Sequence, residues 1–499
     1  MKIIINLFAI FFTITFRFLK EIAAYINARE LTSLRRYLLS INGFRYLNQT
    51  KLTVEPDAGV WFGVDESSNL VDINRDYATD ETINKNEAVI AKLLRERNDL
   101  LTNSNHNYEL GNWDTAKSEF LKADRLEDEA SKHLNIDPLD IRFLGGNLTS
   151  SIGHTSFGFS LRAKMTALSS NPVKRYWILP HSDSNYTYLK YWESKFHTLD
   201  ISPRKLEALQ QNFWFLQESI SSVRTSETES MDLISAHNYY SLEWEKQSRP
   251  PLLYLSDYHN EEGMKFLRQN LGLKNGDWFV TVHVRDEVFS KPDYGRNANI
   301  LSYLAAFDYI FDQGGYVVRI GGNNSRKLPK IPKLFDYAHF PQKSRMMDIF
   351  LLAKAKFMVA TTSGPIGVAS SFGTPILWTN APDIGKAVFH PKALLIPKLI
   401  FNKSDKIISM SEMLSTPLGY TDSQIHKING FENYFQGYKW RDNSETEIVD
   451  GVREMISGKF KDIDPKQRDF ISILESYGNS GSTKIANSFL RQWENIMYN

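Results

Sequence analysis

The sequence predicts an α/β fold built from two Rossmann-like units. From residue 278 to residue 397 the chain repeats an apolar strand, a polar turn and a helix-length segment. Such continuous apolar strands are typical of parallel sheets that helices cover on both faces. The unusual polar residues of this stretch follow the strands, and the carboxyl ends of strands are where doubly wound sheets bind ligands.

The first predicted strand spans residues 278–284 and runs directly into Arg285 and Asp286. His283 and Arg285 are two positions apart, so both side chains lie on the same face of the strand. A helix is predicted over residues 298–312.

The second predicted strand spans residues 316–320, contains Arg319 and ends at two glycines. A short apolar stretch at residues 335–338 then leads to a helix that begins near Ser344. Arg319 therefore repeats, on a neighbouring strand, the placement of Arg285.

The third predicted strand spans residues 357–360 and is followed by the sequence Thr-Thr-Ser-Gly-Pro. Ser363, Gly364 and a proline in the first helical turn indicate a helix start. The backbone amides there can bind an anion. A further strand is predicted at residues 375–378.

A second α/β unit is predicted before this region. Residues 141–144 form a candidate strand, a glycine-rich turn follows, and a helix is expected from about residue 156 to 168. Another strand is predicted over residues 175–179. His154 lies in the glycine-rich turn, where it would either line a site or make a local hydrogen bond.

Composition agrees with a large folded protein. The chain has 499 residues, of which 42% are hydrophobic, and this excludes global disorder. It contains no cysteine, which excludes disulfides, thiolate metal ligands and a cysteine nucleophile. The formal net charge of +1 and the absence of a recognised module disfavour a nucleic-acid partner.

The first 51 residues differ from the rest in charge, with eight Lys or Arg against two Glu. An apolar run at residues 3–16 is shorter than the roughly 20 residues that a spanning helix needs. We therefore expect residues 1–50 to associate with a membrane surface, with a spanning anchor or a packed helix as the alternatives. The expected location is the cytoplasm, at the inner face of the cell membrane.

Five regions follow from these observations. They are the basic and apolar segment 1–50, a linker and helical hairpin at 51–135, an N-terminal Rossmann-like domain at 136–260, a C-terminal Rossmann-like domain at 261–400, and a C-terminal loop with helices at 401–499. Residues 464–498 are expected to form a final pair of helices. Residues 111–123 resemble part of a tetratricopeptide repeat, but one copy favours a plain hairpin.

The motifs of residues 278–397 resemble a bacterial family of surface-polysaccharide glycosyltransferases. The strand that contains His283 and Arg285 is also similar to the histidine-x-arginine strand of the α1,6-fucosyltransferase-like enzymes of the GT-B fold. In this chain two acidic residues follow the arginine. The resemblance covers about residues 137–399. The segments that carry it are His283 to Asp286, Arg296 to Ala298, Gly315 to Gly321, Asp336 to His339, Lys343 with Ser344, Met347 with Asp348, and Thr362 to Gly364.

This resemblance implies a GT-B fold, two Rossmann-like domains facing a cleft. It implies that the C-terminal domain (261–400) binds the nucleotide sugar and that the N-terminal domain (136–260) binds the acceptor. It implies that Arg285 contacts the donor diphosphate, with His283 beside it. The other residues expected to bind the donor are Arg319, Asp336, Tyr337, His339, Ser344, Ser363 and Gly364.

The catalytic base is a separate question. His154 is the first candidate because a histidine accepts a proton near neutral pH. Asp183 and Asp286 are the next candidates. The resemblance implies catalysis without a metal. The single Asp-x-Asp sequence, at residues 462–464, lies beyond the predicted strand exits.

The predicted function is transfer of a sugar from a nucleotide-sugar donor to a surface-glycan or lipid-linked acceptor. No covalently bound cofactor is expected. One alternative is a nucleotide-sugar epimerase or hydrolase of the same fold. The other is a non-catalytic scaffold at the membrane.

Overall fold

The structure is a computed structural model. It describes residues 141–169, 175–178, 185–198, 222–224, 230–286, 295–382, 390–414, 437–458, 465–476 and 483–497, with Glu218 and scattered positions between 89 and 129. The predicted membrane-associating segment and the linker up to residue 80 lie outside these residues. Described positions of the predicted hairpin, such as Leu93 and Ala123, are helical. Asn107 Nδ2 donates to Glu119 Oε2 at 2.8 Å across it.

The larger part of the described chain surrounds a seven-stranded sheet in the order β14-β11-β10-β9-β6-β7-β8, and every neighbouring pair is parallel. We call the described residues 257–497 the C-lobe. Its sheet strands are β6 (Phe279–His283), β7 (Tyr316–Arg319), β8 (Leu334–Asp336), β9 (Met358–Ala360), β10 (Ile376–Ala381), β11 (Ala393–Pro397) and β14 (Lys484–Ile485).

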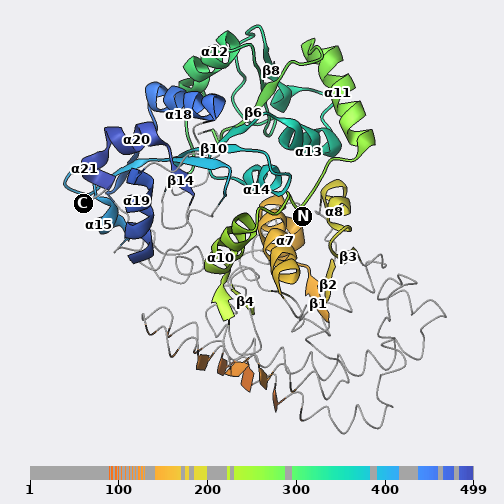
Figure 1. The fold of residues 1–499 in the computed structure, drawn as a ribbon, viewed down its shortest axis with the longest axis vertical. Helices are drawn as coiled ribbons and strands as arrows, with labels where there is room; N and C mark the ends of the chain where they lie inside the picture. The colour runs from red at the N-terminus through yellow and green to blue at the C-terminus, as the bar shows by residue number, and fades with distance from the viewer. Residues whose placement is uncertain are drawn as a thin grey trace, which may run out of the picture.

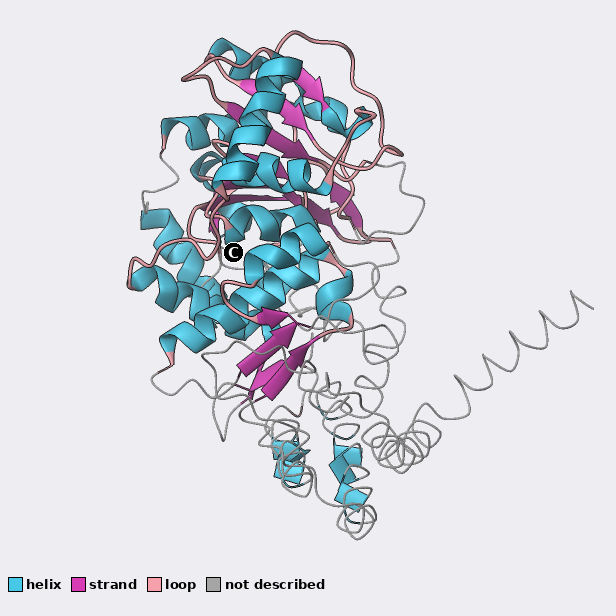
Figure 2. Ribbon diagram, turned by 90° about the vertical axis from the view of Figure 1, so that its right-hand side faces the viewer, coloured by secondary structure: helices cyan, strands magenta, loops and turns pink. Residues whose placement is uncertain are grey.

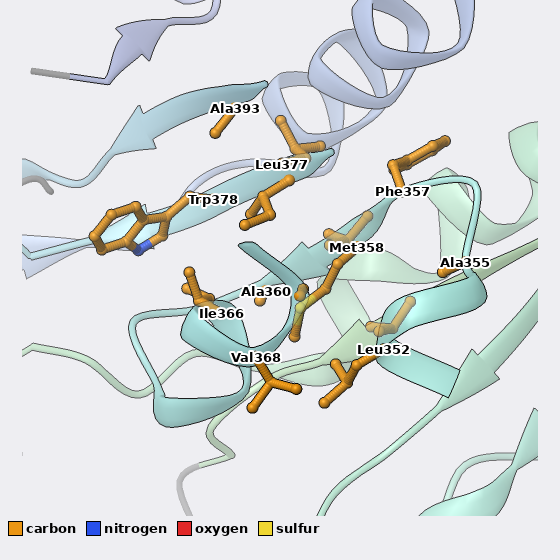
Figure 3. Packing of buried hydrophobic residues seen from close by; sticks show 14 of the residues in the cluster. Leu352, Ala355, Phe357, Met358, Ala360, Ile366, Val368, Leu377, Trp378 and Ala393 are labelled. Carbon is orange, nitrogen blue, oxygen red and sulfur yellow. The ribbon is translucent and has the colours of Figure 1, made fainter. Parts of the chain in front are cut away.

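Two layers of helices cover the C-lobe sheet. On one side α12 packs on α18, which also contacts β10, β11 and α20, while on the other side α13 lies between α11 and α14. Figure 3 shows Ile366 of α14 beside Ala360 and Trp378 of the sheet, with Val368 on the side of the helix toward Leu352. The helices are η3 (Ile300–Tyr303), α11 (Asp257–Leu271), α12 (Leu304–Asp312), η4 (Tyr337–His339), α13 (Arg345–Lys354), α14 (Gly364–Ser371), α15 (Met410–Leu414), α18 (Glu445–Ser457), α19 (Pro465–Ser476), α20 (Asn487–Gln492) and α21 (Glu494–Met497).

The smaller part, the described residues 141–246, is called the N-lobe. Three of its strands, β1 (Ile141–Leu144), β2 (Arg175–Ile178) and β3 (His197–Thr198), form a parallel sheet. The short helix α6 (Asn147–Ser150) and the long helix α7 (Ile152–Leu168) connect β1 to β2, and α8 (Tyr186–Trp192) follows β2. An antiparallel hairpin of β4 (Ser222–Arg224) and β5 (Ser230–Asp232) precedes α10 (Leu233–Lys246).

The C-terminal region departs from the prediction. The sequence predicts two helices over residues 464–498, but Lys484 and Ile485 form strand β14 and pair with β11 at the edge of the C-lobe sheet. A two-residue strand has too little alternation to be seen as a pattern. The antiparallel pair β12 (Leu399–Phe401) and β13 (Lys439–Arg441) also joins distant segments.

The two lobes meet along helices α7 and α14 (Figure 1). The helices run in parallel, because Gly153 contacts Gly364 at their first turns and Ser156 contacts Gly367 one turn later. A Cβ on Gly153 would lie 2.9 Å from Gly364 Cα, and one on Gly367 would lie 2.6 Å from Ser156 Cβ. Only glycine at these positions lets the two backbones approach this closely.

Hydroxyl groups continue the contact along the same helices. Ser160 Oγ and Ser371 Oγ are 3.1 Å apart, and Tyr188 OH lies 2.9 Å from Ser156 Oγ. Tyr188 OH also donates to Ser371 Oγ at 3.3 Å. One apolar cluster, which includes Phe159 of the N-lobe and Val280 of the C-lobe, extends through both lobes.

The predicted α/β fold class with two Rossmann-like units is confirmed by the two parallel sheets, which Figure 2 shows one above the other. Predicted and observed strands agree within a few residues, because each is a short apolar run between turn residues. In the part of the chain that the structure describes, no helix has the length and hydropathy needed to cross a membrane.

The close contact of α7 and α14 gives a stability prediction. Replacing Gly367 with Val forces methyl groups into Ser156, and we expect a loss of about 1–3 kcal/mol of unfolding free energy, as for other overpacked sites. Chemical denaturation followed by circular dichroism measures this loss. The matched control Gln269→Val, at an exposed position of α11, should change stability by less than about 0.5 kcal/mol. Equal effects of the two substitutions would contradict the packing argument.

Candidate functional site

The order of strands in the C-lobe sheet reverses between β6 and β9. From β6 the chain continues through β7 and β8 toward one edge, whereas β9, β10 and β11 continue toward the other. The loops after β6 and β9 therefore leave in opposite directions. Ligands of doubly wound sheets bind in the crevice outside the strands at such a reversal. The topology thus singles out the residues that follow His283 and Ala360.

Thr361 ties these two strand exits together. Its backbone N–H donates to the carbonyl of His283 at 3.1 Å, and its Oγ1 accepts the backbone N–H of Arg285 at 3.0 Å. The Thr361 side chain is fully buried. These two bonds fix the main chain of Arg285, whose side chain is half-buried at the strand exit.

His283 is also half-buried at this exit, and its Nδ1 lies 3.4 Å from the carbonyl oxygen of Ile320. Burial, together with the charges of Arg319, Arg285 and Lys343, lowers the pKa of His283 to about 4, while the bond to Ile320 opposes the shift. The imidazole is therefore neutral at neutral pH. Three cationic groups act on one side chain, so the strand exits carry a positive potential.

Arg319 is fully buried and forms an ion pair with Asp336, with Nη1 and Oδ1 at 2.9 Å. The second carboxylate oxygen of Asp336 accepts the backbone N–H of Leu328 at 3.2 Å. Arg319 Nε and Nη2 have no hydrogen-bond partner within the described residues. The structure therefore places Arg319 below the surface of the exit, where its charge acts on His283 and two of its donors remain unpaired.

Tyr337 and Ser344 hold each other in place. The Ser344 N–H donates to Tyr337 OH at 2.9 Å, and Ser344 Oγ caps α13 by accepting from Met347 N at 3.1 Å. Tyr337 is fully buried. His339 follows on η4, and its Nε2 is buried without a hydrogen-bond partner in the described structure. Of these three residues, His339 retains the polar atom that a ligand could use.

The loop after β9 presents the start of helix α14. Ser363 is the N-cap residue, but its hydroxyl makes no capping bond and is buried without a partner among the described residues. Trp378 Nε1 donates to Thr362 Oγ1 at 2.9 Å and anchors this loop to the sheet. The first turn of α14, which carries the positive end of the helix dipole, therefore lies just after the β9 exit, where it favours an anion.

The N-lobe brings His154 to the same place. Gly153 contacts Gly364 at the start of α14, and His154 is the next residue and is exposed. Ser151, the N-cap of α7, likewise makes no side-chain capping bond. Helices α7 and α14 thus begin side by side at the lobe junction, and the exposed His154 lies in the first turn of α7.

Of the other two candidate bases, the structure describes Asp286. Asp286 is fully buried, and Arg326 Nε lies 3.6 Å from its Oδ2. Asp183 and the Asp-x-Asp sequence at residues 462–464 lie outside the described residues. Groups of three or more His, Cys, Asp or Glu that could hold a metal ion are absent from the ranges that the structure describes.

Sequence patterns did not single out Asn297 as a ligand contact, and they left Lys343 open between attraction of an anionic donor and a solvated surface. The Ala298 N–H donates to the Arg285 carbonyl at 2.8 Å and brings Asn297, whose Oδ1 is buried without a partner in the described region, beside the β6 exit. Lys343 Nζ donates to the carbonyl of Gly321 at the β7 exit. Buried polar atoms in folded proteins are nearly always paired. The unpaired atoms of Asn297, Arg319, His339 and Ser363 therefore mark this edge of the sheet as a place for a polar ligand.

Comparison with known proteins gave matches among solved structures alone. No protein-family model and no curated protein matches the sequence. Among solved structures, E. coli ADP-heptose LPS heptosyltransferase II is 14% identical, with 64% of this chain and 99% of that chain covered and a TM-score of 0.37. A family 9 glycosyl transferase from Veillonella parvula DSM 2008 is 10% identical over 64% and 97% of the two chains, with a TM-score of 0.39. The iron-containing dodecameric glycosyltransferase TibC from enterotoxigenic E. coli is 12% identical over 64% and 76%, with a TM-score of 0.33.

Proposed function

We propose that the protein is a glycosyltransferase that moves a sugar from a nucleotide-sugar donor to a surface-glycan or lipid-linked acceptor. The observation that carries the proposal is the junction at the strand-order reversal. There Thr361 bonds to the main chain of Arg285 two residues before the Ser363 N-cap of α14, and Gly153, which precedes the exposed His154 of the other lobe, contacts Gly364.

The first requirement of sugar transfer is to stabilise the diphosphate that leaves. When the bond between the sugar C1 and the phosphate oxygen breaks, negative charge develops on that oxygen. Arg285 offers a planar, permanently charged fork for phosphate, and the amide of Gly364 with the Ser363 hydroxyl offers hydrogen-bond donors beside it. The main chain at these groups is held before a ligand arrives, because Thr361 fixes the Arg285 backbone and α14 is packed on the sheet.

The second requirement is a base for the acceptor hydroxyl. His154 is exposed, and it lies next to the contact between the lobes. In the proposed reaction the acceptor oxygen attacks C1, and His154 takes the proton that this oxygen loses. In this proposal the base and the diphosphate site come from different lobes, and the two substrates would meet between them.

His283 has a different role in this proposal. With its pKa near 4 it stays uncharged through the neutral range. If Nδ1 carries the proton and donates to the Ile320 carbonyl, Nε2 is an acceptor for a hydroxyl of the donor. The donor pocket is therefore set by His283, while the positive charge comes from Arg285, Arg319 and Lys343.

Metal independence and membrane association belong to the same proposal. Arg285 and the α14 N-terminus would supply the charge that a divalent ion supplies in other transferases. The basic and apolar segment 1–50 would hold the enzyme at the inner face of the cell membrane, near a lipid-linked acceptor.

Nucleotide binding tests the donor site. We expect one family among UDP, GDP, CDP, CMP and ADP, with their sugars, to raise the melting temperature of the full chain. Arg285→Ala should remove this shift, because the diphosphate loses its charged partner. The control Arg453→Ala, on the exposed side of α18, should keep it.

Turnover of the stabilising nucleotide sugar distinguishes the enzyme classes. Release of free nucleotide that requires an acceptor glycan supports transfer, and activity in the presence of EDTA supports metal independence. Conversion of the donor without any acceptor would instead indicate an epimerase or a hydrolase. No shift with any nucleotide in folded protein would favour the scaffold alternative.

Thr361 tests whether the two strand exits act together. Thr361→Val keeps the shape of the side chain but leaves the Arg285 N–H without its acceptor, which costs about 1–3 kcal/mol for a buried donor. We expect a donor dissociation constant at least about tenfold higher in titration calorimetry, equivalent to about 1.4 kcal/mol. Thr361→Ser retains the hydroxyl and should bind nearly as the original protein does; equal weakening by Val and Ser would exclude the hydrogen bond as the cause.

A further inference from the structure

A second cluster of basic residues lies between the lobes, away from the strand exits. Lys164 of α7 and His237 of α10 belong to the N-lobe, and His390, just before β11, belongs to the C-lobe. Lys164 is eleven residues beyond Gly153 on α7, which corresponds to about 16 Å along the helix. The cluster is therefore separate from the proposed donor site.

The contacts within the cluster cross the lobe boundary. Lys164 Nζ donates to Ser241 Oγ at 2.8 Å, and this oxygen lies 3.2 Å from His237 Nδ1. The rings of His237 and His390 meet edge to face, with centroids 6.3 Å apart. His390 Nδ1 in turn lies 2.7 Å from Ser370 Oγ near the end of α14. The two imidazoles thus form a lobe-to-lobe contact at the opposite end of the α7 and α14 pair from the glycines.

Neither histidine has an acidic partner. His237 is 3% exposed and stacks on Phe157, with ring centroids 4.3 Å apart, and His390 is 8% exposed beside Trp378. Within the described residues, no carboxylate hydrogen-bonds to Lys164, His237 or His390. Glu245 of α10 is the one acidic group that acts on the cluster, through Lys164. Charge on either imidazole would be buried next to Lys164 and the other ring.

We propose that His237 and His390 make the contact between the lobes sensitive to protons, so that the lobes stay together at neutral pH and separate reversibly in mild acid. The proposed base His154 and the proposed donor site come from different lobes, so separation would also move them apart. The proposal depends on the lobe contact and not on the proposed function, because it concerns the shape of the protein with or without a nucleotide.

The direction of the effect follows from the histidines. Burial, then Lys164, then His390 lowers the pKa of His237 well below its usual 6.5, and burial with Lys164 lowers the pKa of His390 to about 3. Both rings are neutral in the closed form and regain ordinary titration when water reaches them. The form in which the lobes are in contact is therefore fully favoured above pH 6.5, and its population decreases as the pH falls below that value. Each histidine shifts the equilibrium about tenfold per pH unit, or about a hundredfold for the pair.

Lys164 changes the pH at which the lobes separate in this proposal. Its own pKa is lowered to about 8 by burial, with Glu245 opposing the shift, so it carries charge at pH 6. That charge disfavours protonation of both rings in the closed form. Removing it should let the closed form tolerate protons better, and separation should then need a lower pH.

Small-angle X-ray scattering of the full chain from pH 7.5 to 5.0, with far-ultraviolet circular dichroism on the same samples, tests the proposal. We expect the radius of gyration to rise below pH 6.5 at constant helix content, and to return when the pH is restored. The double variant His237→Gln/His390→Gln keeps side chains that can bond to Ser241 and Ser370 and should not expand. Lys164→Met should expand at a lower pH than the original protein.

Each outcome decides the proposal. An expansion of equal size and pH in the original protein and the double variant would overturn it. So would loss of the helical signal together with the expansion, because that is global unfolding. If the double variant does not fold, His390→Gln alone should halve the steepness of the transition, and an unchanged steepness would also overturn the proposal.

Discussion

The close approach of α7 and α14 is the contact on which the arrangement of this protein depends. Gly153 against Gly364, and Ser156 against Gly367, let the two helix backbones touch where ordinary side chains would keep them apart. The hydroxyls of Ser160 and Tyr188 both pair with Ser371 across the lobe boundary and leave little room for sliding. A single apolar cluster then forms through both lobes.

This contact also has an electrostatic consequence. Two helices that run in parallel place their positive ends together, which is unfavourable unless a negative group lies nearby. Here both N-cap serines leave their caps unmade, and Arg285 with two further cationic groups adds to the positive potential. An anionic ligand at the junction would relieve this repulsion and contact both lobes at once. The contact between α7 and α14 therefore also positions two helix N-termini for the ligand of the proposed donor site.

Much of the C-lobe could be predicted because its strands are short apolar runs between polar turns. The exits of β6 and β9 were found in this way, and so were Ser363 and Gly364. What could not be predicted depends on which strands become neighbours. Thr361 bonds to Arg285 across 76 residues of sequence, and only the pairing of β6 with β9 brings them together. The same reason hid the histidine cluster, because His237 and His390 belong to different lobes. Arg319 carried the right residue type at a strand end, yet its pairing with Asp336 beneath the surface required the structure.

Strand β14 has a consequence for the way the chain is made. It supplies the outer neighbour of β11, yet about ninety residues separate the two along the sequence. During synthesis β11 has no partner on that side until residue 485 has left the ribosome. An open strand edge is a template for pairing with another chain. The protein thus passes through a period of exposure to misassembly on each round of translation, and premature termination before Lys484 would make that exposure permanent.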